Sequence, residues 1–295
     1  MPLKALKKET TERLSLEWVL HVKNYKLDLD KSRCVGCQVC SQACPKEAIQ
    51  TRKQPRNAGE KAKKAGIDVD LSKCNFCGIC EILCPYGAIR ISVDGQHILS
   101  VVEKESFPQL IRDIEVNPTA PLLSSDKWGD SCPLDLIHVS TGANEAQMIS
   151  VQKEYCPGCR VCEAKLPQGA IHVSRLFYGK LNVDAKKCPE GCKDCLEVCP
   201  IEGALLVSAD DSKVHVDERF CVYCGACKIV CPVEDAINLR RTKVNHTAVR
   251  SGAWNKALER LTSPVEMTKE LKSKGSSRAR ESVKMRMGMG EKKNA

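Results

Sequence analysis

One cysteine pattern recurs along this chain and constrains its fold more strongly than any other feature. The chain has 295 residues, of which 20 are cysteines. Complete copies of the run C-x2-C-x2-C-x3-C-P begin at Cys34, Cys74 and Cys221, and a copy with one extra residue in its first gap begins at Cys188. In such a run three cysteines hold one [4Fe–4S] cluster, and the fourth holds a second cluster nearby. Four such runs predict a chain that folds around iron–sulfur clusters.

The remaining cysteines form two fragments that complement each other. Cys132 precedes a proline but has no triplet in front of it. A separate triplet consists of Cys156, Cys159 and Cys162, and Leu166 occupies the place of its fourth cysteine. Because the fourth ligand crosses between the halves of a two-cluster pair, we expect Cys132 to complete this triplet. The second site of this region is then predicted to have been lost.

The same crossing rule assigns every cysteine of the chain to one of five [4Fe–4S] clusters. Five sites with four ligands each use all 20 cysteines. The predicted ligand sets are Cys34, Cys37, Cys40 with Cys84; Cys74, Cys77, Cys80 with Cys44; Cys156, Cys159, Cys162 with Cys132; Cys188, Cys192, Cys195 with Cys231; and Cys221, Cys224, Cys227 with Cys199.

Two other uses of cysteine fit the spacing less well. Structural zinc is usually held by two separated C-x2-C pairs, and a compact triplet with a distant Cys-Pro differs from that arrangement. Disulfides are typical of secreted chains. The opening residues MPLKALKKETTERL are charged and contain no apolar signal stretch. The pattern therefore favours iron–sulfur clusters over zinc and over disulfides.

The predicted fold class is α+β, with three tandem ferredoxin-like units built from short hairpins and short helices. Stretches such as KLDLDKSRC and GIDVDLSKC alternate apolar and polar residues ahead of the cysteines, which predicts short strands. Each Cys-Pro is expected to open a single helical turn. The predicted segments are an N-terminal helix over 1–26, a two-cluster unit over 27–95, a degenerate one-cluster unit over 96–180, a two-cluster unit over 181–242 and a helical basic C-terminal arm over 243–295.

Two segments carry local signals outside the cysteine runs. Leu14, Trp18 and Val22 are spaced four residues apart, which indicates one face of a helix that covers the neighbouring unit. Residues 51–66 are polar and basic, and we expect them to form a solvated loop inside the first unit.

Two further predictions concern turns. The stretch IHVSRLFYGKLNVD is predicted to form a hairpin that turns at Tyr178 and Gly179. Glycines beside the cysteines, among them Gly36 and Gly158, are expected to let backbone N–H groups approach the sulfur atoms. Hydrogen bonds of that kind help to set the reduction potential of a cluster.

Charge is divided unevenly between the cysteine-rich region and the C-terminal arm. The formal net charge is +9, and residues 243–295 hold 13 Lys and Arg against 5 Asp and Glu. Residues 1–242 hold 33 against 32 and are almost neutral. Each cluster with its four thiolates adds about −2, so that five loaded sites would make this region acidic by roughly nine charges. The chain is therefore predicted to be an acidic cluster array with a basic arm.

The arm has helix signals of its own. Apolar residues at helical spacing are Trp254, Ala257, Leu258 and Leu261. A capping box with proline at the first helical position follows at residues 263–266, and Gly275 is a plausible stop. We favour a role in docking to an acidic protein surface; wrapping of its own core and binding of nucleic acid are the alternatives.

No catalytic constellation is visible in the sequence. The chain lacks G-x-G-x-x-G after a strand, a Walker A run and H-E-x-x-H. No run approaches the eighteen or so apolar residues of a membrane span. These features predict a cytoplasmic electron-transfer subunit that is not itself an enzyme, acting with catalytic redox subunits and ferredoxin-level donors or acceptors. A cluster-bearing regulator of nucleic acid is the alternative from another class.

At its cysteine motifs, over about residues 34–237, the chain resembles a polyferredoxin. More specifically, it is similar to the polyferredoxin component of the formylmethanofuran dehydrogenase of methanogenic archaea. The resemblance implies electron supply for the reversible reduction of CO2 to a formyl group on methanofuran, in an anaerobic methanogen. A polyferredoxin of a hydrogenase or heterodisulfide reductase complex would carry the same motifs. The fewer clusters, the degenerate middle unit and the long basic arm depart from the pattern of the formylmethanofuran dehydrogenase component.

Overall fold

The structure is a computed structural model that describes residues 3–55, 60–117, 128–141, 147–209, 212–249 and 251–262. Its strands are β1 (Lys4–Glu9), β2 (Arg13–Val19), β3 (Asn24–Asp30), β4 (Ile49–Arg52), β5 (Gly66–Val69), β6 (Ile89–Val93), β7 (Ile114–Val116), β8 (Ile137–Thr141), β9 (Gln147–Val151), β10 (Ile171–Val173), β11 (Phe177–Val183), β12 (Leu205–Val207), β13 (Val214–Val216) and β14 (Ile237–Val244). Its helices are α1 (Val39–Ala43), α2 (Ile79–Ile82), α3 (Ser100–Glu103), α5 (Val161–Lys165), α6 (Asp194–Glu197), α7 (Ala226–Val230) and α8 (Gly252–Thr262), with a 3-10 turn at Lys153–Tyr155.

One strand-pairing scheme occurs three times along the chain. In the first unit, defined by β3 to β6, the outer strands β3 and β6 pair and the inner strands β4 and β5 pair. The middle unit pairs β7 with β10 and β8 with β9. The third unit pairs β11 with β14 and β12 with β13. The strands predicted ahead of the cysteine triplets are confirmed as β3, β5, β9, β11 and β13.

The predicted N-terminal helix is wrong, because this segment forms β1 and β2, which extend the sheet in the order β1-β2-β3-β6. Leu14 and Leu16 are both fully buried, whereas Val22 is 86% exposed. A spacing of four residues is compatible with a helix and also with every second residue of a strand. The burial of Leu16, two residues from Leu14, distinguishes the two, since it would lie away from Leu14 on a helix.

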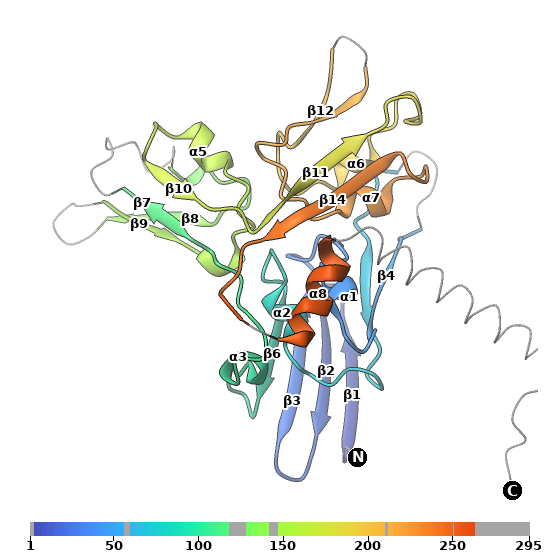
Figure 1. Cartoon of the computed structure of the whole chain (residues 1–295), viewed down its shortest axis with the longest axis vertical. Coiled ribbons are helices and arrows are strands. Elements are labelled where there is room, and N and C mark those ends of the chain that lie inside the picture. The colour runs from blue at the N-terminus through green and yellow to red at the C-terminus, as the bar shows by residue number, and fades with distance from the viewer. Residues whose placement is uncertain are drawn as a thin grey trace, which may run out of the picture.

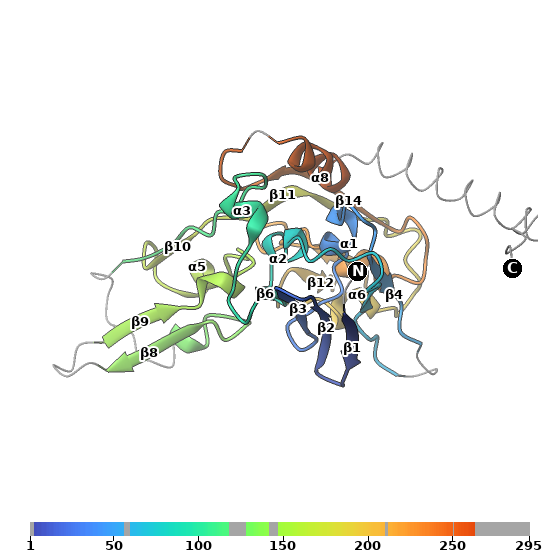
Figure 2. The same cartoon turned by 90° about the horizontal axis from the view of Figure 1, so that it is seen from below.

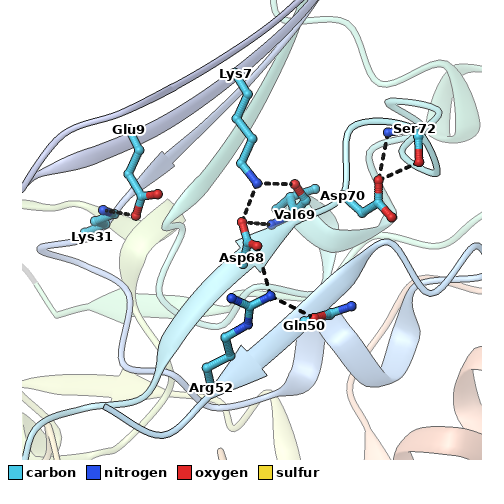
Figure 3. A network of polar contacts seen from close by, with 9 residues as sticks. All are labelled: Lys7, Glu9, Lys31, Gln50, Arg52, Asp68, Val69, Asp70 and Ser72. Carbon is cyan, nitrogen blue, oxygen red and sulfur yellow. Dashed lines mark hydrogen bonds and ion pairs between the residues drawn. The ribbon is translucent and has the colours of Figure 1, made fainter. Parts of the chain in front are cut away.

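The N-terminal sheet is joined to the inner strands of the first unit by polar contacts (Figure 3). Lys7 on β1 forms an ion pair with Asp68 on β5 at 2.5 Å and donates to the carbonyl of Val69 at 2.9 Å. Arg52 on β4 reaches the other carboxylate oxygen of Asp68 at 3.5 Å. Each surface ion pair of this kind contributes little to the free energy of unfolding. These contacts therefore mainly fix the position of the hairpin β1–β2 over β4 and β5.

In the four complete cysteine runs, the short helices α1, α2, α6 and α7 lie before the Cys-Pro and not after it, which corrects the predicted position of the helical turns. α1, for example, ends at Ala43, and Cys44 has an extended backbone with ψ 115°. The following proline disfavours the helical region for the residue that precedes it. The residues after Cys-Pro form a tight turn, in which Glu47 has φ 52° and donates its N–H to the carbonyl of Cys44.

The predicted hairpin at residues 171–184 is also wrong. β10 and β11 pair with the distant strands β7 and β14 and not with each other. β11 runs straight through Tyr178 and Gly179, where the register with β14 shifts by a bulge. A Cβ on Gly179 would collide with the backbone of Arg240, so the close approach of the two strands requires glycine here.

The first part of the predicted arm belongs to the folded core. Val244 ends β14, and α8 confirms the helix expected around Trp254, whose indole packs edge-on against Phe107 at 5.2 Å. Trp254, Ala257 and Leu261 are buried. The second predicted helix of the arm lies outside the described residues. Across the described residues, none of the helices has both the length and the apolar character that crossing a bilayer requires.

The first and third units lie against each other, and the middle unit projects to one side of them (Figures 1 and 2). α8 is placed between the first and third units, where it packs against α1 and β14. The basic loop of the first unit also reaches the third unit, because Lys53 donates to the carbonyl of Cys231 at 2.8 Å. Cysteine side chains belong to all three apolar cores.

Candidate iron–sulfur sites

The pairing scheme explains how cysteines distant in sequence come together. A triplet follows the first strand of each outer pair, and a Cys-Pro precedes its second strand, so that antiparallel pairing brings both to one end. In the first unit, burial raises the pKa values of Cys34 and Cys40, and repulsion from the nearby sulfur of Cys84 adds to both shifts. Across the inner pair, Cys44 acts on Cys74 and Cys80.

Three of the five predicted sets line apolar cavities. One cavity is lined by Cys44, Cys74, Cys77 and Cys80 together with Leu27, Phe76 and Ile91. A second is lined by Cys132, Cys156, Cys159 and Cys162 together with Ile114, Ile137 and Val173. A third is lined by Cys199, Cys221, Cys224 and Cys227 together with Leu181, Ile201 and Ala226.

The other two predicted sets are also brought together. The remaining member of the set that begins at Cys34 is Cys37. Burial raises the pKa of Cys37, and repulsion from the sulfurs of Cys40 and Cys84 adds to this rise. In the third unit, burial raises the pKa of Cys188, and repulsion from the sulfurs of Cys192 and Cys231 adds to this rise. The structure thus places all five predicted sets as groups.

The thiols stand in surroundings that suit a metal cluster better than free thiolates. Burial, followed by repulsion from neighbouring sulfurs, raises the pKa of Cys162 to about 12. Burial likewise raises the pKa of Cys159 to about 12 and that of Cys195 to about 11. Metal binding deprotonates such thiols and offsets part of their negative charge. Within the described ranges, no three His, Cys, Asp or Glu side chains converge as they would on a single metal ion.

Backbone N–H groups point at the sulfur atoms. Gly36 donates to Cys34, and Gly158 donates to Cys156, which agrees with the role expected of these glycines. Gly36 has φ +68°, and a Cβ there would lie 2.5 Å from the carbonyl oxygen of Ala65. Only glycine therefore fits this close approach.

A second group of N–H donors was not predicted from the sequence. The residue four positions after the cysteine of Cys-Pro turns its N–H back to that sulfur. The contacts are Ala48 to Cys44 at 3.4 Å, Ala88 to Cys84 at 3.3 Å and Leu136 to Cys132 at 3.4 Å. The repeated apolar residue at this spacing is the signal that could have indicated them.

Apolar side chains fill the place where the middle unit would have had its second predicted site. Leu166 occupies the place of the fourth cysteine and is 6% exposed. Trp128 occupies the place of the third cysteine of the missing triplet and is 2% exposed. Both belong to one apolar core with Ile171 and Val173. The other two positions of the missing triplet, Leu122 and Ser125, lie outside the described residues.

Arginines connect the cysteine sets of different units. Arg112 donates to the carbonyl of Cys84 at 2.8 Å in the first unit and to the carbonyl of Cys156 in the middle unit. Arg175 of the middle-to-third connection donates to the carbonyl of Cys221 at 2.9 Å. These side chains depend on packing between units, which local sequence patterns do not reveal.

The first and third units meet where Cys37 faces Cys224, and we call this place the inter-unit junction. Burial raises the pKa of Cys37, and among the neighbouring sulfurs that of Cys224 adds most to this rise. Tyr86 is buried between them, and burial, followed by repulsion from Cys224 and Cys37, raises the pKa of its hydroxyl. Among the described residues this hydroxyl has no nitrogen or oxygen partner, so the Cys224 sulfur is its polar neighbour.

Two segments of the chain match the family of 4Fe-4S dicluster domains, residues 26–88 and residues 180–249. The chain is 33% identical over 106 residues to the polyferredoxin-like subunit of an aliphatic sulfonate oxidoreductase of Pyrococcus furiosus, which covers 32% of this chain and 59% of that protein. It is 30% identical over 86 residues to the hydrogenase-4 component A of Escherichia coli, which covers 26% of this chain and 40% of that protein. The matched regions thus span 59% or less of these relatives.

A solved structure resembles nearly the whole chain. It is a chain of the formate dehydrogenase–heterodisulfide reductase–formylmethanofuran dehydrogenase complex of Methanospirillum hungatei. The TM-score is 0.78 at 30% identity, and the match covers 89% of this chain and 92% of that chain. The two dicluster domains, the polyferredoxin-like relative and this structural match show that the chain belongs to the polyferredoxins.

Proposed function

We propose that this polyferredoxin holds five [4Fe–4S] clusters in three ferredoxin-like units and relays low-potential electrons within an oxidoreductase complex. The observation that carries the proposal is that three of the predicted four-cysteine sets line apolar cavities and that the sulfurs of the other two sets lie close enough to repel one another, as crossed pairing requires. When bound, a cluster supplies a one-electron redox couple. The chain contributes the thiolate ligands, the N–H donors and the apolar walls that exclude water.

The proposed path follows the contacts between cysteine sets. In the first unit, the sulfur of Cys80 repels that of Cys40 and adds to the rise that burial causes in its pKa, so the two cysteine sets of this unit lie close to each other. The path then crosses the inter-unit junction from Cys37 to Cys224. In the third unit, Cys195 acts on Cys227 and leads to the outermost set. The set of the middle unit branches from the first unit beside Arg112.

We propose formylmethanofuran dehydrogenase, in its CO2-reducing role, as the catalytic partner. The extended likeness to a chain of the Methanospirillum hungatei complex supports this partner. Heterodisulfide reductase, named in the same complex, and a hydrogenase, as for the component of Escherichia coli, are the alternatives. A cytoplasmic location is proposed because all 20 cysteines are proposed as cluster ligands, and the cytosol keeps thiols reduced.

The proposed docking role of the arm now concerns residues 263–295, since α8 covers the core. Arg260 on α8 donates to the carbonyl of Cys44 at 3.1 Å, so the described part of the arm serves its own fold. This packing gives no support to the nucleic-acid-binding alternative. A chain that ends after Thr262 should keep its iron and lose copurification with the partner, whereas a cut before Lys243 should destabilise the third unit.

The experiment that tests the electron-transfer proposal is chemical analysis of the anaerobically purified chain. Five clusters require about 20 iron and about 20 acid-labile sulfide per chain. Redox titration should find the centres in the lower part of the roughly −700 to +450 mV range of such clusters. Zinc in place of iron, or centres reduced well above about −200 mV, would contradict the proposal.

A further inference from the structure

Arg241 is a buried cation at the inter-unit junction. It lies on β14 and is 4% exposed. Its guanidinium donates to the carbonyls of Tyr223 at 2.8 Å and Cys224 at 2.7 Å within the third unit. It also reaches Gln42 Oε1 of the first unit at 3.0 Å and the carbonyl of Leu261 on α8 at 3.4 Å. One side chain therefore joins the first unit, the third unit and α8.

All four of these acceptors are neutral. Among the described residues, no carboxylate forms an ion pair with Arg241. Arginine stays protonated in proteins, and a buried cation without an anionic partner is strongly destabilising. A charge of this kind persists in a fold when an anion close by compensates it.

The compensating groups are cysteine sulfurs. Burial lowers the pKa of the Arg241 guanidinium, and the sulfurs of Cys37, Cys224 and Cys221 act against that effect. They belong to two different predicted sets, one in each unit. At this place the backbones are also close, since the Cys37 carbonyl oxygen lies 3.6 Å from where a Cβ on Gly225 would stand. The guanidinium thus lies beside members of both sets where the two units meet.

We propose that Arg241 is the fixed counter-charge of the inter-unit junction and raises the reduction potentials of the two clusters that meet there. The inference rests on the proposed function. A cluster gains one negative charge on reduction, and a nearby fixed cation stabilises that charge in a medium of low dielectric constant. Arg241 therefore favours electrons at the junction over the outer sites of both units.

The electron balance of the crossing is simple. One cluster at the junction is oxidised by one electron, and its neighbour is reduced by the same electron. No proton needs to move, because Arg241 keeps its charge in both states. Arg241 acts on the clusters through space and through the Cys224 backbone, and it is a positioning residue in this scheme.

The test compares midpoint potentials of the loaded chain by redox titration monitored with electron paramagnetic resonance. Arg241→Gln should lower the equilibrium constant for reduction of two centres about tenfold, which lowers their midpoint potentials by about 59 mV for one electron. The other three centres should keep their midpoints. Arg241→Lys keeps the positive charge, so its midpoint potentials should stay close to those of the wild-type chain. Arg240→Gln, on the same strand at an exposed position, is the matched control and should shift none.

A second variant keeps the proposal testable if Arg241→Gln loses iron. Gln42→Glu places a carboxylate beside the guanidinium and should lower the same two midpoints with the iron content unchanged. Unchanged midpoints in Gln42→Glu, or an equal shift of all five centres, would overturn the proposal. A wild-type chain without low-potential centres would instead contradict the proposed function itself.

Discussion

The first unit, with its β3–β6 and β4–β5 pairs, contains two complete cysteine sets, whereas the middle unit has the same two kinds of pairing and contains one set. Trp128 and Leu166 stand where the second set would have its sulfurs, and both are buried. The comparison shows that this scaffold accepts either a cysteine set or an apolar core at the same place. The scaffold is set by strand pairing, and the filling can differ.

Removal of iron should have the largest effect, and it should affect the first unit much more than the middle unit. Thiol-lined cavities lose their central filling without metal, and small metal-dependent domains commonly unfold in the apo form. We expect the first and third units to lose their structure and the core around Trp128 to remain. The three tryptophans, Trp18, Trp128 and Trp254, lie in different regions, so single-tryptophan variants report each by fluorescence. Simultaneous unfolding of all three would show that the apolar core has no independent stability.

Cys132→Ser tests whether the middle unit holds a cluster in crossed fashion. The variant should lose about 4 of about 20 iron atoms, or retain a three-iron form of that centre. The remaining centres should survive because their ligands lie in other units. Ser131→Ala, which changes the buried neighbour, is the matched control and should keep all its iron. An unchanged iron content and paramagnetic spectrum in Cys132→Ser would contradict the crossed pairing.

Trp128→Ala probes the apolar half of the same unit. Truncation of a buried tryptophan typically costs about 3–5 kcal/mol of unfolding free energy. The loss should appear in the middle unit by hydrogen exchange, with the first unit unchanged. Met148→Ala, at a side chain that is 62% exposed, serves as control and should have little effect. A protection loss spread over all units would mean that the middle unit does not unfold separately.

Leu166→Cys should have the smallest effect. The variant restores one of four ligands, and Trp128 still occupies the place of another, so no iron should be added. Stability should fall by about 1.6 kcal/mol, the scale for losing two buried carbon groups. Iron analysis and thermal unfolding measure both quantities. An additional centre in this variant would show that the lost site needs fewer cysteines than we infer.

The sequence predicted the features that depend on local spacing. The strands ahead of the triplets were found because two-residue alternation stands beside cysteines of fixed spacing, as in β3 and β5. The helix around Trp254 was found because its apolar residues follow helical spacing over two turns. The grouping of the cysteines followed from the repeat, since each fragment lacked what another segment supplied.

Features that depend on long-range pairing were missed. The N-terminal segment was misread because a spacing of four fits both a helix and a strand, and only pairing of β2 with β3 decides between them. The hairpin at Tyr178 was misread because β11 finds its partner β14 more than fifty residues later. Arg112 and Arg241 gain their roles only where units meet, and nothing in their neighbouring sequence marks them.

The nested pairing scheme also sets the order in which the chain can be built. The pairs of the first unit close once Val93 has been made, those of the middle unit at Val173 and those of the third unit at Val244. Domains commonly fold as units during synthesis, beginning at the N-terminus. Each unit can therefore take up iron and sulfide before the next emerges from the ribosome. The inter-unit junction is complete last, when Arg241 and α8 arrive, so electron flow through the whole chain awaits the end of its synthesis.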